Sequence, residues 1–378
     1  MILFILMHDL RGGTLLDSSA YNSYTRQALA WRSGQMHLQE NVKWLELAIF
    51  EGEYWVSFPP VPSVFMLPLT FIFGMNTPDN VVMLALVLLS VTAAYLCCKD
   101  RGYSSGQSTL VAVGVVLGSN LFNMSMEGAV WFMAQSFSFC FCMWAIYGAI
   151  KGRFCIALLL VALALGCRPF CVLLALPLFA MFLQKTLTDS DKSAWKKLLK
   201  VDMTVLAAIL IGLALMLYNF ARFNNGFEFG HSYLPEFNRG EAQFSLSYIL
   251  RNLKGLCSMV SLSEGAVLNF TKFNGFFPLI ANPIFIILIV EAVKCTRRRE
   301  WTLINLITMG AMLLNFLFLL CHRTFGGHQF GARYMVDLIP YTFLFLICLP
   351  KRKIHSWTTA VFAFSFIFNL YGALAVEL

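Results

Sequence analysis

Charged side chains are scarce in this sequence: Asp, Glu, Lys and Arg make up 13% of its 378 residues, whereas hydrophobic types make up 58%. That balance excludes a water-soluble domain, because such a chain could not cover its surface with polar groups. The sequence also lacks internal repeats, low-complexity segments and the paired Cys-x-x-Cys spacing of zinc sites. Its 11 cysteines lie mostly in apolar runs, where we interpret them as small hydrophobic side chains.

The apolar residues form long runs that predict an all-α polytopic membrane protein with about 10–11 transmembrane helices. The net charge of +8 resides in short basic clusters between these runs, which indicates membrane topology and no nucleic-acid partner. The runs are residues 81–98, 108–122, 129–150, 154–167, 170–183, 201–220, 277–293, 301–320, 334–349 and 357–371. We expect residues 1–378 to form a single transmembrane domain.

Basic clusters fall in every second connection, and by the positive-inside rule those connections are cytoplasmic. The clusters lie at residues 99–101, 151–153, 185–200, 297–299 and 351–353. The alternation requires that the apolar stretch Pro60 to Gly74, which contains Pro68, lies along the outer interface as a broken short helix. The outer side then receives a first loop with interfacial helices (9–80), a second long loop (221–275) and a glycine- and arginine-rich loop (321–333). Met1 to His8 is apolar but too short to span, and we interpret it as a clipped first helix.

Two acidic residues stand out among the outer connections. Asp17 precedes Tyr21, Tyr24, Ala28 and Trp31 at helical spacing, which predicts an interfacial helix with an acid at its start. A helix N-cap is the alternative interpretation of Asp17, because Asp fills that position routinely. Glu127 lies in a very short outer turn, where an acid is either held at the interface or directed into a shared cavity.

Four further candidates lie near the ends of apolar runs. Arg168 precedes Pro169 at the outer surface and suits either a bound anion or lipid headgroups. Arg222 and His231 begin the second long loop, and no second histidine stands beside His231 at metal-ligand spacing. Tyr54 belongs to an aromatic stretch that approaches the interface, where aromatic residues are common without a function.

The last outer loop, CHRTFGGHQFGARYMVDLIPY, combines His322, Arg323, His328 and Arg333 with three glycines. Glycines allow close backbone approach, and an arginine suits a phosphate geometrically. Arg333 at a helix start would therefore form a phosphate-binding site at the membrane surface. Contact with lipid phosphates is the alternative, but it does not explain the glycine spacing.

Several motifs in order resemble the integral-membrane C-type glycosyltransferases that use a polyprenyl-phosphate-linked sugar, such as dolichyl-phosphate-mannose mannosyltransferases and aminoarabinose transferases. They are the acid Asp17 followed by a Tyr-rich helix ending near Gly34, Tyr-x-x-x-Phe-Pro-Pro-x-Pro (54–62), Gly-Cys-Arg-Pro (166–169), Phe-Gly-Ala-Arg-Tyr (330–334) followed by Pro340, and YNFARFNNGFEFG (218–230). The sequence departs from the family in its nearly missing first helix. It also has Asp17 followed by Ser18 where the family usually has two acids, and Glu127 would supply the second.

The resemblance implies an inverting transfer of a hexose or pentose on the periplasmic, extracellular or lumenal side. Asp17 would accept the proton of the acceptor, because a carboxylate in a partly desolvated loop has its pKa raised toward the operating range. Arg333, helped by Arg222 or His328, would stabilise the phosphate charge, while Arg168, His231 and Tyr54 would contribute to substrate binding. Some relatives place a divalent metal between acids and phosphate, and no ligand spacing in this sequence demands one.

The expected partners are a lipid-linked sugar donor, membrane lipids, and a lipid, glycan or protein acceptor, at a bacterial inner or plasma membrane in preference to the endoplasmic reticulum. A transporter or flippase of a lipid-linked or anionic solute is the competing class, but it predicts polar residues deep in the helices. An inactive homologue that only binds lipid-linked sugar is the third interpretation.

Overall fold

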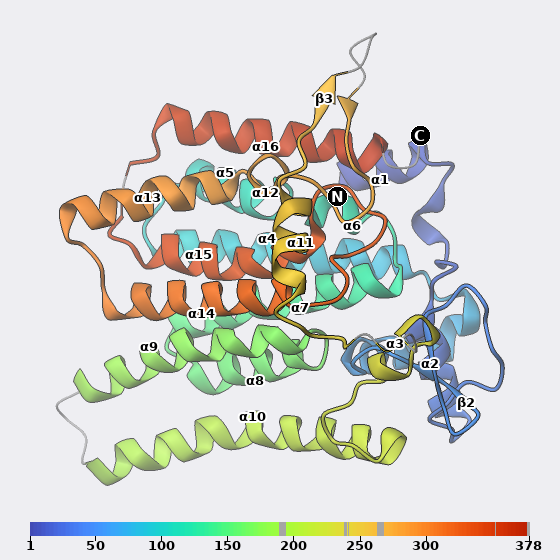
Figure 1. Cartoon of the computed structure of the whole chain (residues 1–378). Helices are drawn as coiled ribbons and strands as arrows, with labels where there is room; N and C mark the ends of the chain where they lie inside the picture. The colour runs from blue at the N-terminus through green and yellow to red at the C-terminus, as the bar shows by residue number, and fades with distance from the viewer. Residues whose placement is uncertain (189–193, 238–239, 241, 263–267, 352, 376–378) are drawn as a thin grey trace.

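The computed structural model describes residues 1–188, 194–237, 240, 242–262, 268–351 and 353–375, and this part of the chain is built mainly of helices. In Figure 1 the long helices run side by side from left to right, and short helices and strands gather toward the right-hand end. The predicted all-α polytopic architecture is confirmed.

Six segments of the described chain are long and apolar enough to cross a membrane, since a spanning helix needs about 20 residues. They are Asp79–Asp100 (α4), Val130–Ile150 (α7), Pro169–Thr188 (η3, Pro169–Leu174, followed by α9, Ala175–Thr188), Val205–Phe223 within α10 (Ala194–Phe223), Leu303–Leu320 (α14) and Ser356–Ala375 (α16). Each coincides with a run expected from the sequence.

The four remaining runs form shorter helices within the same bundle. These are α5 (Ser105–Val116), α8 (Phe154–Leu165), α13 (Ile284–Arg298) and α15 (Ile339–Cys348), with the single turns α6 (Leu121–Met124) and α12 (Pro278–Ala281) beside α5 and α13. Helix α5 packs closely on α16, because a Cβ at Gly114 would lie 2.1 Å from the ring of Phe362. Small residues allow membrane helices to approach each other closely. The resulting van der Waals packing stabilises the helix pair, because lipid supplies no hydrophobic driving force between helices.

Three fully buried asparagines join the ends of α5 and α13 to the middle of α16. Asn282 Nδ2 donates to Asn120 Oδ1 over 2.7 Å, and the Asn120 backbone N–H donates to Asn282 Oδ1 over 2.9 Å. Asn369 Nδ2 donates to the Ala281 carbonyl over 3.0 Å and thereby ties α16 to the same point. Buried amides must be paired in a low-dielectric interior, so this cluster fixes the relative positions of the three helices.

The basic connections lie together at one end of the bundle. Lys151 pairs with Asp100 over 3.1 Å, and Lys351 donates to the Gly102 carbonyl, so three of these connections are in contact. In Figure 1 the α13–α14 and α15–α16 connections also lie at the left-hand end. These connections therefore share one end of the bundle, as the alternation of basic clusters in the sequence predicts.

The opposite end begins with α1 (Ile2–Leu10). The first loop after it contains η1 (Thr14–Leu16), α2 (Ser23–Arg32), the antiparallel hairpin of β1 (Leu47–Phe50) and β2 (Glu53–Val56), α3 (Val61–Phe73) and η2 (Gly74–Asn76). Helix α2 is the helix predicted after Asp17. Helix α3 has 13 residues with Pro68 inside, so it is about 20 Å long and too short to span. The expected broken short helix is therefore present.

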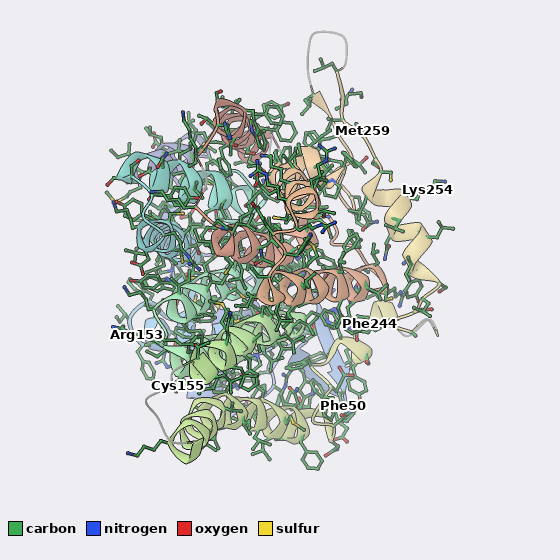
Figure 2. All side chains as sticks on the ribbon, turned by 90° about the vertical axis from the view of Figure 1, so that its left-hand side faces the viewer. Phe50, Arg153, Cys155, Phe244, Lys254 and Met259 are labelled. Atoms are coloured by element: carbon green, nitrogen blue, oxygen red, sulfur yellow. The ribbon has the colours of Figure 1, made fainter. Side chains whose placement is uncertain are left out.

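The later outer loops add η4 (His231–Tyr233), η5 (Pro235–Phe237), α11 (Tyr248–Leu256), the paired β3 (Ser261–Leu262) and β4 (Leu268–Asn269), and η6 (Arg333–Leu338), which leads into α15. Helix α11 runs across the long helices in Figure 1. In Figure 2, Lys254 and Met259 lie at the right-hand edge of the molecule, away from the bundle.

Candidate functional site

A cavity of about 910 Å³ opens at the end of the bundle opposite the basic connections. Its wall combines the first loop, the start of α7, the break before η3, the loop after α10, α11 and the last outer loop. The volume lies within the range typical of small-molecule sites, about 300–1,000 Å³. Of the eight residues singled out from the sequence, Arg168, His231 and Arg333 line this cavity.

Arg168 lies in extended backbone between α8 and η3, where Pro169 prevents the helix from continuing. Its Nε and Nη2 atoms donate to Asp337 Oδ2 over 2.8 and 2.5 Å, and Gln135 Nε2 donates to Asp337 Oδ1 over 2.7 Å. Burial opposes the charge of Arg168, but the Asp337 carboxylate raises the pKa of the guanidinium above its ordinary value. Arg168 is therefore a fixed cation in the cavity wall.

Arg333 begins η6 and is buried, with an exposed fraction of 7%. Its Nη2 donates weakly to the Gly326 carbonyl over 3.4 Å, and its guanidinium lies 5.0 Å from the Tyr334 ring centroid. Within the described residues no carboxylate lies at ion-pair distance from it, and burial lowers its pKa. A buried guanidinium that borders a cavity without a carboxylate partner is a candidate anion-binding group.

The glycines of the last loop shape its backbone, and Gly326 and Gly327 line the cavity together with Arg333. Gly326 and Gly327 have φ values of +121° and +97°, which L side chains rarely adopt. Gly331 packs on the buried Asn120, because a Cβ there would lie 2.2 Å from the Asn120 amide. The glycine spacing thus positions the loop, and Arg333 with it, on the asparagine cluster.

Two histidines face the same space. The rings of His231 and His322 are 6.0 Å apart, and both line the cavity. His231 Nδ1 is 3.2 Å from the Ser57 carbonyl, and His322 Nδ1 is 2.8 Å from the Thr324 carbonyl. Burial lowers both pKa values, that of His322 to about 4, so both rings are neutral near pH 7.

Carboxylates from two loops add to the polar lining. Glu46 accepts from Trp131 Nε1 over 2.8 Å, while Glu228 accepts the backbone N–H of Gly230 over 2.6 Å. Burial raises the pKa of Glu236, and the neighbouring Glu46 adds to that shift. Glu46, Glu236 and Gln135 could not be predicted from the sequence, because no motif or spacing distinguishes them from other loop and helix residues.

The two predicted catalytic acids lie outside the cavity lining. Asp17 is exposed and ends η1, whereas α2 begins at Ser23 after Asn22, so Asp17 does not cap that helix. The expected partial desolvation of Asp17 is therefore wrong. Glu127 is half-buried and accepts from Ser19 Oγ over 3.3 Å.

The predicted roles of Arg222, Tyr54 and His328 also require correction, because none of the three lines the cavity. The Arg222 guanidinium is surrounded by the rings of Tyr218, Phe223 and Trp55, and it donates to the Val56 carbonyl. It fastens the β1–β2 hairpin to α10.

Tyr54 lies on β2 and packs against a small hydrophobic cluster that includes Leu38 and Leu47. The side chain of His328 is exposed, and its backbone bridges to Phe273. The histidine that this loop contributes to the cavity is His322. No group of three His, Cys, Asp or Glu side chains with metal-binding geometry occurs among the described residues.

No family model matches this sequence, and no curated protein is similar to it in sequence. Solved structures with a similar fold include ArnT from Cupriavidus metallidurans bound to undecaprenyl phosphate, with 12% identity over 92% of this chain and 57% of that chain and a TM-score of 0.50. The oligosaccharyltransferase of Archaeoglobus fulgidus in its apo form matches with 13% identity over 99% of this chain and 55% of that chain, also at a TM-score of 0.50. The chain spans a little over half the length of either protein. Both are integral-membrane C-type glycosyltransferases, and the chain has their fold.

Proposed function

We propose that this chain is a membrane glycosyltransferase that takes a sugar from a polyprenyl-phosphate donor and transfers it to an acceptor on the outer side of the membrane. The observation that supports this most directly is Arg333, which is buried, borders the cavity and lacks a carboxylate partner within the described chain. The similar fold of ArnT, a structure that holds undecaprenyl phosphate, makes a lipid-borne phosphate the anion to test first.

The polar groups of the cavity suit the charges of such a reaction. When the bond between the anomeric carbon and the phosphate oxygen breaks, negative charge grows on the leaving phosphate. Arg333 would hold that charge, and Arg168, fixed by Asp337, would add a second positive group beside it. The aromatic side chains of Phe170, Phe227 and Phe244 in the wall would contact the first isoprene units and the sugar.

The proposal predicts an inverting single displacement, because one set of cations can hold the leaving phosphate while the acceptor attacks from the opposite face. It leaves the sugar and the acceptor open, since these depend on the detailed shape of the cavity. A bacterial plasma membrane, with the cavity on its outer side, remains the predicted location.

The test is release of polyprenyl phosphate by purified protein in lipid nanodiscs supplied with a panel of polyprenyl-phosphate sugars. Replacing Arg333→Gln should lower the rate by about 10²–10³-fold, the effect of removing one well-placed charge-stabilising donor. Arg26→Gln is the matched control, because Arg26 lies on α2 in the same outer region and pairs with Glu40 outside the cavity. Equal rates for wild type and Arg333→Gln would exclude Arg333 from the reaction. Uptake of a solute into vesicles without sugar release would instead indicate a transporter.

A further inference from the structure

Glu46 is the carboxylate that the fold of the first loop presents to the cavity. It lies between Leu45 and Leu47, which are both buried in a small hydrophobic cluster beside the β1–β2 hairpin. Its own carbonyl accepts from Ser57 Oγ over 2.8 Å. The backbone on both sides of Glu46 is therefore anchored, and only its side chain turns toward the cavity.

The side chain is oriented by the start of α7. Trp131 Nε1 donates to Glu46 Oε2 over 2.8 Å, a charge-assisted hydrogen bond. The Trp131 ring lies 4.9 Å from the ring of Tyr21, and the Val130 backbone N–H donates to the Tyr21 carbonyl over 3.0 Å. Tyr21, four residues after Asp17, thus packs against Trp131, and Trp131 in turn donates the hydrogen bond that orients Glu46.

Glu46 lines the same cavity as Arg333, the proposed phosphate-binding residue. Its carboxylate interacts electrostatically with Arg333, yet the two form no ion pair within the described chain. It also lies near Glu236, whose pKa is raised. Glu46 thus accepts one hydrogen bond, lies near a guanidinium without a carboxylate partner in the described chain, and borders the same cavity. This arrangement suits a proton acceptor in a displacement reaction.

We propose that Glu46 is the general base of the transfer reaction, an inference that rests on the proposed function. The acceptor oxygen forms a bond to the anomeric carbon as the bond from that carbon to the phosphate oxygen breaks. The bonding electrons leave with the polyprenyl phosphate toward Arg333, and the acceptor proton passes to the Glu46 carboxylate. Trp131 is a positioning residue, because it orients the carboxylate without touching the reacting atoms.

The assay follows donor hydrolysis, with water as the acceptor, in nanodiscs that contain a polyprenyl-phosphate sugar found active with the wild type. Glu46→Gln keeps the size of the side chain and removes its basicity, and it should lower kcat by about 10²–10⁴-fold. Binding of undecaprenyl phosphate should stay within about twofold of wild type, which separates a chemical defect from misfolding. Glu53→Gln, on the neighbouring strand and outside the cavity lining, should retain wild-type turnover.

Two further variants test the positioning role of Trp131 and the alternative that Asp17 is the general base. Trp131→Phe keeps an aromatic ring against Tyr21 but removes the N–H donor, so kcat should fall by about tenfold or more with unchanged KM. Asp17→Asn should remain active. Full activity in Glu46→Gln, or inactivity confined to Asp17→Asn, would overturn the assignment of Glu46 and leave the proposed function intact. No hydrolysis or transfer by the wild type with any donor would overturn both.

Discussion

The ion pair between Arg168 and Asp337 gives the strongest prediction about stability. Asp337 is 5% exposed and Arg168 is 19% exposed, and their closest atoms are 2.5 Å apart. Asp337→Asn keeps the shape of the side chain but leaves the buried guanidinium without its counter-charge. Removing one partner of such a pair costs about 3–5 kcal/mol of unfolding free energy, because the remaining charge stays buried.

An exposed ion pair of the same chain provides the control. Lys151 and Asp100 are 3.1 Å apart with exposed fractions of 42% and 29%, so Asp100→Asn should cost no more than about 1 kcal/mol. Replacing both buried partners together, as Arg168→Met with Asp337→Leu, should recover much of the loss. Recovery of stability would show that the cost comes from the uncompensated charge.

The assay is reversible unfolding in mixed detergent micelles, followed by far-ultraviolet circular dichroism as the denaturing detergent increases. The predicted order of stability is wild type, Asp100→Asn, the double variant and then Asp337→Asn. If Asp337→Asn unfolds at the same detergent fraction as Asp100→Asn, then Arg168 is not a buried cation and cannot serve as a fixed positive group beside the phosphate.

Three other outcomes follow from the structure. The pKa of His322 is lowered to about 4 in the folded protein, so between pH 6.5 and about 4 the unfolded protein binds more protons than the folded protein does. The free energy of unfolding should therefore fall by up to about 3 kcal/mol as the pH decreases through that window. His322→Gln should flatten this pH dependence in the same unfolding assay. Asn282→Ala removes two buried hydrogen bonds to Asn120 and should cost about 1–3 kcal/mol, whereas an unchanged unfolding midpoint would contradict the role of the asparagine cluster. Cys257, exposed at the end of α11, should react with a membrane-impermeant maleimide in intact cells, and labelling only after permeabilisation would reverse the proposed orientation.

The sequence contains enough information to predict the helices and the two ends of the bundle. Long apolar runs can be recognised from local composition alone. Basic connections can be recognised from the Lys and Arg residues between those runs. Arg168, Arg333 and His231 could also be predicted as candidate site residues. Arg168 precedes a proline break, Arg333 begins a helix after a glycine-rich loop, and His231 lies in the loop that follows a long apolar run.

The remaining site residues depend on contacts between distant segments, which composition and spacing do not reveal. Glu46 faces the cavity because Trp131, on another helix, holds its carboxylate. Arg222 is enclosed by aromatic rings of the β1–β2 hairpin and of its own helix, a packing that the loop sequence does not predict. His322 and His328 are equally plausible by sequence, and the turn at Gly326 and Gly327 separates the buried ring from the exposed one.

Binding of undecaprenyl phosphate to the purified protein in nanodiscs tests the phosphate-binding role of the cavity without requiring either the sugar or the acceptor. We expect saturable binding by the wild type that weakens about tenfold or more in Arg333→Gln, in line with the loss of a charge-assisted contact, and stays unchanged in Arg26→Gln. Absence of saturable binding by the wild type, or equal binding by Arg333→Gln, would contradict that role.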